Sequence, residues 1–221
     1  MQSNGPDITL DTRAQEYNRQ LGDVFDLPGK GRDYLEAHAL TDRALVDQYQ
    51  LGCVRNPLAG DERFRGFLSI PYQTRFGVVA ITYRCVIPHD HGTHGGKYGQ
   101  YSGQTAHLYN PNACFLANSP IGIAEGEVDA LVASAAILPT LGISGVSKWS
   151  SMSKIWTIIL NDFDYVVVFA DGDKAGIDSA RRIQEDLGRK AVIARCDEGE
   201  DVASMVAAGR QDVLRARAGL T

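Results

Sequence analysis

The stretch VVVFADGDKAG, residues 166 to 176, decides the fold of the second half of the chain. Its first five residues are apolar, and two aspartates, Asp171 and Asp173, follow them with only a glycine between. A continuous apolar run bounded by turn residues is typical of a strand buried on both faces, as in a parallel sheet. Acidic residues directly after such a strand lie at the sheet edge where open α/β proteins bind ligands.

The segments around this stretch repeat the alternation of strand and helix. The pattern predicts strands over 121–124, 140–143, 165–170 and 190–194, and helices over 128–136, 150–160, 177–187 and 202–208. Gly188 and Gly209 stand where helices commonly end. Continuous apolar strands alternating with helices indicate an α/β fold, with a parallel sheet flanked by helices.

The first half has a different pattern, which predicts a mixed α/β (α+β) lobe. We expect a helix over 33–51 and strands over 67–70 and 77–84, separated by the turn-prone Gln73-Thr74-Arg75. A polar step with a proline, Asn118-Ser119-Pro120, precedes the first strand of the second half. We therefore expect an N-terminal lobe over residues 1–117. We expect a parallel-sheet domain over residues 118–221, which ends in a C-terminal helix.

Composition and charge exclude several classes of protein. No apolar run approaches the roughly 18 residues of a membrane span, and the N-terminus lacks a signal-peptide pattern, so we expect a cytoplasmic protein without a membrane partner. The four cysteines form no CxxC pair, so neither structural zinc nor a disulfide framework is expected. The net charge is −5, and residues 118–221 hold 15 Asp+Glu against 11 Lys+Arg. The second half therefore concentrates negative charge that needs an explanation.

Three of the predicted strand ends are acidic. Glu125 follows the first strand with Asp129 one helical turn on, Asp171-Gly172-Asp173 follows the third, and the loop 197–201 follows the fourth. Neighbouring strands would bring these carboxylates together, which raises their pKa values unless a cation compensates, and hard oxygen ligands suit Mg²⁺ or Mn²⁺. Taken alone, an Asp-Gly-Asp after a strand is most often a turn or a helix cap. Together, the three acidic strand ends favour a metal site.

In this order and spacing, the acidic motifs resemble those of the Toprim domain, which DnaG-type primases, topoisomerases and several nucleases share. The matching motifs are Glu125-Gly126-x-x-Asp129, then Asp171-Gly172-Asp173-x-Ala175-Gly176, and then Gly199-Glu200-Asp201. The DGDxAG motif of the primase branch is complete. The second aspartate of the third primase motif falls on Ala203, so metal binding from this loop rests on Asp201, with Glu200 and Glu198 as weaker candidates.

The first half is similar to the opening of the DnaG-type catalytic core, although more loosely. The predicted helix is similar to that of the family from Tyr34-Leu35 to Gln50-Leu51-Gly52, although His38-Ala39 stands where the family has Arg-Gly. The pair of predicted strands ends in Arg84, as in the family. Lys97-Tyr98 and Leu108-Tyr109 match two further family motifs, but the lysine expected between them is absent. The resemblance thus covers about residues 31–209.

This resemblance implies a primase catalytic core of the bacteriophage kind, which makes short RNA primers on a single-stranded DNA template from ribonucleoside triphosphates. The resemblance implies that the catalytic acids are Glu125, Asp171 and Asp173. It implies that these three, with Asp129 and Asp201, bind two Mg²⁺ or Mn²⁺ ions. It also implies nucleic-acid or nucleotide contacts by Arg84, Lys97, Tyr98 and Lys174. The sequence contains neither the zinc-binding nor the helicase-binding region of DnaG. A separate zinc-binding primase subunit and a replicative helicase are therefore the partners to expect.

Two other functions remain open at this stage, and one segment has an unassigned role. The same acids can direct water in a Toprim nuclease, and a non-catalytic nucleic-acid-binding module can use the domain as a scaffold; a topoisomerase is disfavoured because the chain is short. His89, His91 and His94 lie within six residues, a pattern seen in zinc sites, but their glycine-rich setting favours a nucleic-acid-covering or mobile loop.

Overall fold

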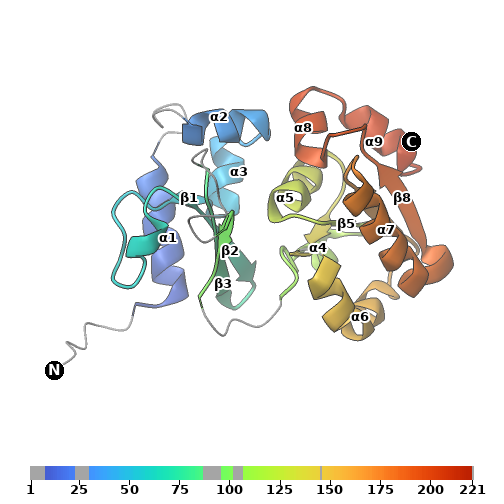
Figure 1. Cartoon of the computed structure of the whole chain (residues 1–221). Helices are drawn as coiled ribbons and strands as arrows, with labels where there is room; N and C mark the ends of the chain where they lie inside the picture. Colours follow the sequence, from blue (N-terminus) through green and yellow to red (C-terminus); the bar gives the residue numbers. More distant parts are fainter. Residues whose placement is uncertain (1–7, 23–29, 87–95, 102–106, 145, 221) are drawn as a thin grey trace. The chain divides into compact units, whose positions relative to one another are not determined.

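The computed structural model describes residues 8–22, 30–86, 96–101, 107–144 and 146–220 (Figure 1). The chain divides into two compact units, Met1–Leu35 with Thr41–Gln104, and Glu36–Leu40 with Thr105–Thr221. The boundary between Gln104 and Thr105 lies earlier in the chain than the boundary at residues 118–120 that the sequence suggested. Tyr109 forms a bridge to Gly142, and Ala113 packs in the core of the second unit, so the segment before Asn118 belongs with that unit.

The first unit is built on a four-stranded antiparallel sheet with the order β1-β2-β3-β4. Its elements are α1 (Leu10–Leu21), α2 (Lys30–Ala37, of which the last two residues fall in the second unit), α3 (Arg43–Gln48), β1 (Gly52–Cys53), the 3₁₀ helix η2 (Glu62–Phe64), β2 (Leu68–Thr74), β3 (Gly77–Arg84) and β4 (Tyr98–Gly99). The predicted strands near 67–70 and 77–84 are present, and the mixed character of this lobe is confirmed.

The predicted helix over 33–51 is two helices, which corrects the expectation from sequence. Ala39 has a φ of 54°, which is outside the right-handed helical region, so the helix cannot continue through this residue. Asp42 then acts as the N-cap of α3, because its side chain accepts a hydrogen bond from the backbone N–H of Ala44 at 2.9 Å. An aspartate at this position starts a new helix rather than continuing an old one.

A buried carboxylate holds the first unit together. Asp61 is fully buried and pairs with Arg13 of α1 at 2.5 Å. It also accepts hydrogen bonds from the hydroxyls of Tyr17 and Tyr101, and a longer one from Tyr83 at 3.4 Å. A charge can be buried at this depth only when it is paired and hydrogen-bonded, so this cluster fixes α1 against the sheet.

The second unit contains a four-stranded parallel sheet with the order β6-β5-β7-β8. Its elements are α4 (Ala113–Leu116), β5 (Ile121–Ala124), α5 (Glu127–Ala136), β6 (Thr140–Gly142), α6 (Val146–Leu160), β7 (Val166–Ala170), α7 (Lys174–Leu187), η3 (Gly188–Lys190), β8 (Ala191–Arg195), α8 (Val202–Ala207) and α9 (Gln211–Arg217). In Figure 1 the helices flank this sheet. The predicted α/β fold with a parallel sheet is confirmed.

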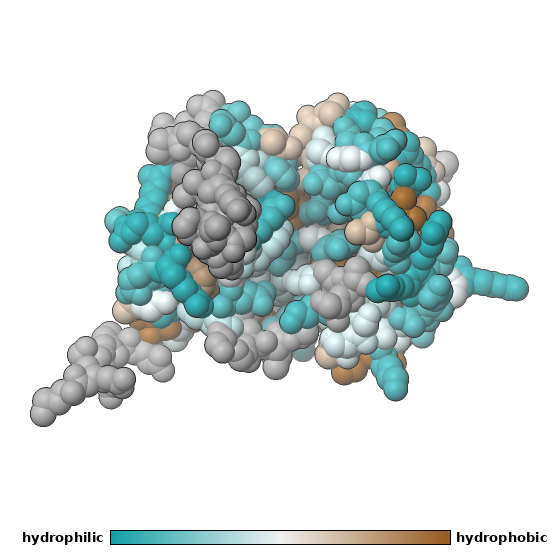
Figure 2. All heavy atoms as spheres, viewed as in Figure 1, coloured by the Kyte–Doolittle hydropathy of each residue, from teal (hydrophilic) through white to brown (hydrophobic). Residues whose placement is uncertain are grey.

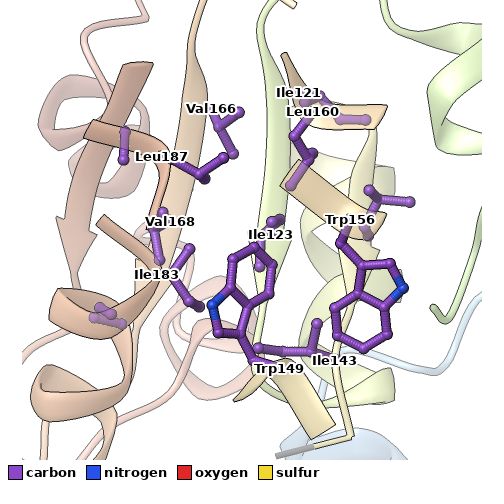
Figure 3. Close-up of a cluster of buried hydrophobic side chains, with 14 of the residues drawn as sticks. Ile121, Ile123, Ile143, Trp149, Trp156, Leu160, Val166, Val168, Ile183 and Leu187 are labelled. Atoms are coloured by element: carbon purple, nitrogen blue, oxygen red, sulfur yellow. The ribbon is translucent and has the colours of Figure 1, made fainter. Parts of the chain in front are cut away.

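One face of this sheet packs on α6 and α7, as Figure 3 shows. Alternate residues of a strand point to the same face, so the isoleucines of β5 and the outer valines of β7 meet the two tryptophans of α6 and the aliphatic side chains of α7. The labelled residues are Ile121, Ile123, Ile143, Trp149, Trp156, Leu160, Val166, Val168, Ile183 and Leu187. Burying each of these side chains contributes about 1.5–3 kcal/mol, so the strand ends are held rigidly.

The surface is mainly polar on the face drawn in Figure 2, where hydrophobic residues form only small separate patches. Within the described part of the chain, every helix is too short or too polar to span a lipid bilayer.

Candidate active site

The carboxyl ends of three adjacent parallel strands carry the predicted acids. β5 pairs with β7 and β7 pairs with β8, so their ends lie side by side at one edge of the sheet. Glu125 follows β5 directly, Asp171 follows β7 directly, and Asp201 ends the loop after β8. The sheet order thus brings together acids that lie far apart in the sequence.

The pKa of Asp171 reflects the other predicted acids around it. Partial burial raises the pKa of Asp171 to about 8, and the negative charges of Asp129, Glu125, Asp201 and Asp173 add to the rise. Each of these four carboxylates therefore lies close enough to oppose ionisation of Asp171. All five predicted acids of the candidate metal site share one electrostatic neighbourhood.

Glu125 occupies a less charged part of the same site. Its pKa is raised by burial, and the charge of Asp173 raises it further, whereas a hydrogen bond with Ser179 opposes the rise. Ser179 lies on α7 and is only 4% exposed. This buried serine therefore orients the Glu125 carboxyl group from the next helix along the chain.

Three of the acids also bind helix N-termini. The Oδ1 atom of Asp173 accepts a hydrogen bond from the Gly176 N–H at 2.7 Å and caps α7, and Oδ1 of Asp201 accepts one from the Ser204 N–H at 2.7 Å and caps α8. Asp129 Oδ1 accepts one from the N–H of residue 203 at 3.0 Å. The helix-cap interpretation of Asp-Gly-Asp is thus correct for Asp173, and Asp201 is a helix cap that the sequence analysis did not suggest. It does not exclude metal binding, because each carboxylate has a second oxygen.

Two glycines of the central motif are required by close packing. A Cβ atom on Gly172 would lie 1.6 Å from the carbonyl oxygen of Asp197, and one on Gly176 would lie 2.7 Å from Cβ of Asp171. Gly172 also donates its N–H to the carbonyl of Glu200 at 2.8 Å. The DGDxAG segment therefore lies directly against the loop that follows β8.

In that loop, two acids are neutralised by arginines of the C-terminal part of the chain. Arg210 pairs with Asp197 at 2.6 Å and with Glu200, and Arg217 pairs with Asp197 at 2.7 Å. The pKa of Asp197 is lowered, chiefly by its hydrogen bond with Arg217. Glu200 is thus engaged by an arginine, which leaves Asp201 as the stronger metal-ligand candidate of this loop.

The donor chemistry of this site fits a hard divalent cation. Its donors are carboxylate oxygens, the donor type that Mg²⁺ and Mn²⁺ prefer. Burial raises the pKa of Asp171, and so does the repulsion of the neighbouring carboxylates, which a bound cation would relieve. Among the described residues, no group of three or more acidic, histidine or cysteine side chains is spaced so that it could hold a metal ion in this structure. The cap contacts of Asp173 and Asp201 hold one oxygen of each away from that role.

The predicted nucleic-acid contacts of the first unit form their own cluster. Arg84 is only 8% exposed, and its guanidinium lies 4.8 Å from the ring centres of both Tyr34 and Tyr98. Arg84 also donates a hydrogen bond to the hydroxyl of Tyr98, which is 44% exposed. Lys97 is exposed beside it. Arg84 therefore holds two aromatic rings, and Lys97 and Tyr98 are exposed to solvent.

Two further predicted features are Lys174 and the histidine-containing loop. Lys174 is the exposed first residue of α7, next to Asp173. The loop with His89, His91 and His94 lies outside the described residues.

Sequence reasoning missed Ser179, Arg210 and Arg217 as partners of the acids. No local sequence pattern pairs the arginines with the loop at 197–200. Ser179 carried a weak signal, since it lies on the helix that opens with the DGDxAG motif. Only the sheet order and the packing of α8 and α9 reveal these contacts.

Comparison with known structures identifies the fold. The DnaG catalytic core aligns with a TM-score of 0.69 and 20% identity, over 94% of this chain and 77% of that one. The RNA polymerase domain of Mycobacterium tuberculosis primase DnaG aligns with 0.70 and 16%, over 94% and 80%. The primase fragment of the bacteriophage T7 primase-helicase protein aligns with 0.60 and 15%, over 80% and 70%. The chain thus has the fold of primase catalytic cores.

Comparison of sequences gives the family. No protein-family model matches the chain. The gene 57 protein of Mycobacterium phage D29 is 32% identical over 159 residues, which are 70% of this chain and 99% of that protein. The chain belongs to the family of this phage protein.

Proposed function

We propose that this protein is a DNA primase catalytic core, which makes short RNA primers on single-stranded DNA by metal-dependent nucleotidyl transfer. One observation carries the proposal: Glu125, Asp171 and Asp201 follow three adjacent parallel strands, within a chain that has the fold of primase cores. In this proposal the second unit is a Toprim domain, and the relationship to a phage protein favours a role in phage DNA replication in the host cytoplasm.

The acids would have distinct roles in this reaction. Glu125, Asp129, Asp171, Asp173 and Asp201 would hold one or two Mg²⁺ or Mn²⁺ ions. Such ions supply Lewis-acid stabilisation of the charge on a triphosphate. As an alternative to metal binding, Glu125, which is half-buried with a raised pKa, would accept a proton from the attacking ribose hydroxyl. Ser179 would keep its carboxyl group oriented for that transfer.

The first unit would bind the polynucleotide. Tyr98 offers a partly exposed ring on which a base can stack, and Lys97 beside it offers a charge for a phosphate. Arg84 holds the Tyr98 side chain through its hydrogen bond and its position over the ring. Lys174, at the start of α7, would contact the triphosphate from the side of the metal acids. Local basic groups of this kind explain how a chain of net charge −5 can bind a polyanion.

The partners follow from the same proposal. The Mycobacterium tuberculosis domain was solved with double-stranded DNA, and the T7 fragment belongs to a primase-helicase. We propose a single-stranded template and ribonucleoside triphosphates as substrates here, with a replicative helicase and a separate zinc-binding subunit as partners.

Extension of a short RNA annealed to a DNA template tests the proposal without requiring start-site recognition. The wild-type protein with Mg²⁺ or Mn²⁺ should add labelled ribonucleotides, and Asp171→Asn should lower the rate at least about 100-fold. Asp162→Asn, which removes an exposed acid outside the site, is the matched control. The proposal fails if the wild type does not extend the RNA, or if Asp171→Asn extends it as well as the control does. Cleavage of the template without extension would indicate a nuclease instead.

A further inference from the structure

Two arginines join the C-terminal helix to the acidic loop after β8. The guanidinium of Arg210 uses one nitrogen for Asp197 at 2.6 Å and the other for Glu200, so it bridges two acids of one loop. Arg217 binds the second oxygen of Asp197 at 2.7 Å and the carbonyl of Arg195, the last residue of β8, at 2.6 Å. Two acidic side chains of the loop, Asp197 and Glu200, are therefore attached to α9 and its N-cap residue.

The same loop is fixed on its other side by the DGDxAG segment. The Gly172 N–H donates to the carbonyl of Glu200 at 2.8 Å, and the carbonyl of Asp197 lies where a Cβ of Gly172 would be. Asp201, the next residue after Glu200, begins α8 in a capping box with Ser204. The position of the Asp201 carboxylate therefore depends on a loop held between Gly172 and the arginines.

We propose that Arg210 and Arg217 are positioning residues, which fix the 197–201 loop so that Asp201 faces Asp171 at the candidate metal site. This inference rests on the proposed function, since it assigns the arginines to the support of a metal site. They do not touch the reacting atoms. In this proposal Asp197 and Glu200 hold the loop in place through the arginines, and Asp201 serves the metal site.

The geometry of Arg210 makes the inference specific. A guanidinium has two terminal nitrogens in a fixed plane, so a single side chain bonds Asp197 and Glu200 at the same time. A lysine keeps the charge but offers one compact ammonium group, which cannot keep both acids in this geometry. If the arginine acted only through its charge, lysine would replace it fully.

The test compares Arg210→Lys and Arg210→Gln with the wild type and with Arg182→Gln. Arg182 is an exposed arginine of α7, so its substitution removes the same charge away from the loop. Hydrogen exchange measures the backbone amides of Gly172 and Ser204, whose acceptors belong to the loop. Titration of Mn²⁺, followed by the electron paramagnetic resonance signal of the free ion, measures metal affinity without any turnover.

We expect faster exchange at both amides in the two Arg210 variants. We also expect Mn²⁺ affinity about 10- to 100-fold weaker in Arg210→Gln, a partial recovery in Arg210→Lys, and no change in Arg182→Gln. Unchanged exchange in Arg210→Gln would overturn the inference, and so would full recovery by lysine or faster exchange with unchanged Mn²⁺ affinity. If the wild type binds no Mn²⁺ at all, the proposed metal site itself is refuted, while the exchange data still report whether Arg210 holds the loop.

Discussion

The charge at Asp171 leads to a prediction about stability in the absence of metal. The pKa of this carboxyl group rises from the ordinary 3.8 to about 8 because it is largely buried and faces four other carboxylates. Well below pH 3.8 the group is protonated in both the folded and the unfolded state and costs nothing. As the pH rises toward 8, the unfolded state ionises freely and the folded state does not, so stability is lost across this window.

The magnitude follows from the size of the rise. One pKa unit corresponds to about 1.36 kcal/mol, so an increase from 3.8 to about 8 corresponds to at most about 6 kcal/mol at a pH above both values. Solvent reaches part of the side chain, and the repulsion is shared among several acids. A single Asp171→Asn substitution should therefore recover about 2–3 kcal/mol of unfolding free energy at pH 8.5 and about 1 kcal/mol at pH 5.5.

Urea unfolding in the presence of a chelator measures this difference, with Asp162→Asn as the control for loss of an exposed charge. Addition of Mg²⁺ should then stabilise the wild type and leave Asp171→Asn nearly unchanged, because binding to the folded state alone adds to its stability. The reasoning is refuted if Asp171→Asn is no more stable than the wild type at pH 8.5 without metal. It is equally refuted if Mg²⁺ stabilises both proteins to the same extent.

Three further substitutions test other parts of the structure. Gly172→Ala places a Cβ 1.6 Å from the carbonyl oxygen of Asp197, so the backbone must move and the protein should lose about 3 kcal/mol or more in thermal or urea unfolding; a wild-type midpoint would show that the loop gives way freely. Asp61→Asn leaves the mostly buried Arg13 side chain without its charge partner, and should cost about 3–5 kcal/mol, unlike the exposed control Asp162→Asn. Tyr98→Ala should weaken single-stranded DNA binding by about 1–3 kcal/mol, whereas Tyr98→Phe, which keeps the ring, should bind nearly as the wild type does; equal binding by all three proteins would exclude base stacking at this position.

The parallel sheet of the second unit could be predicted closely from the sequence. The structure places β5 at Ile121–Ala124 and β7 at Val166–Ala170, within a residue of the expected bounds. Both strands are buried on both faces, so their apolar runs are uninterrupted, and their ends are marked by acids and glycines. Because these strands are buried on both faces, the sequence pattern predicts both the parallel sheet and the edge of the sheet where the acids lie.

The helix α1 could not be predicted in the same way. Only Ala14, Tyr17 and Leu21 of its twelve residues are buried, and the others are almost all polar. Its stability depends on the sheet of the first unit and on the buried Asp61, which in the sequence stands in a short polar stretch after a glycine. Thr9, whose hydroxyl accepts a hydrogen bond from the Thr12 N–H at 3.2 Å, was the one local signal for its start.

The arginine contacts of the candidate site escaped prediction for a related reason. Arg210 lies 13 residues from Asp197 in the sequence, and the turn of the chain through α8 brings them together. Charged residues at such spacings are common and usually solvated, so the sequence pattern does not distinguish an ion pair from an exposed helix face. Packing of α8 and α9 decides the matter.

The two interpretations of the acidic motifs, helix cap and metal ligand, describe different oxygens of the same side chains. Asp173 uses Oδ1 for the Gly176 N–H, which stabilises the start of α7 and fixes the direction of its other oxygen. Asparagine caps helices about as well as aspartate does, whereas alanine costs about 1 kcal/mol. Asp173→Asn should thus keep the stability of the wild type and lose Mn²⁺ affinity, while Asp173→Ala should lose both. If asparagine at this position binds Mn²⁺ as tightly as aspartate, Asp173 is a cap alone.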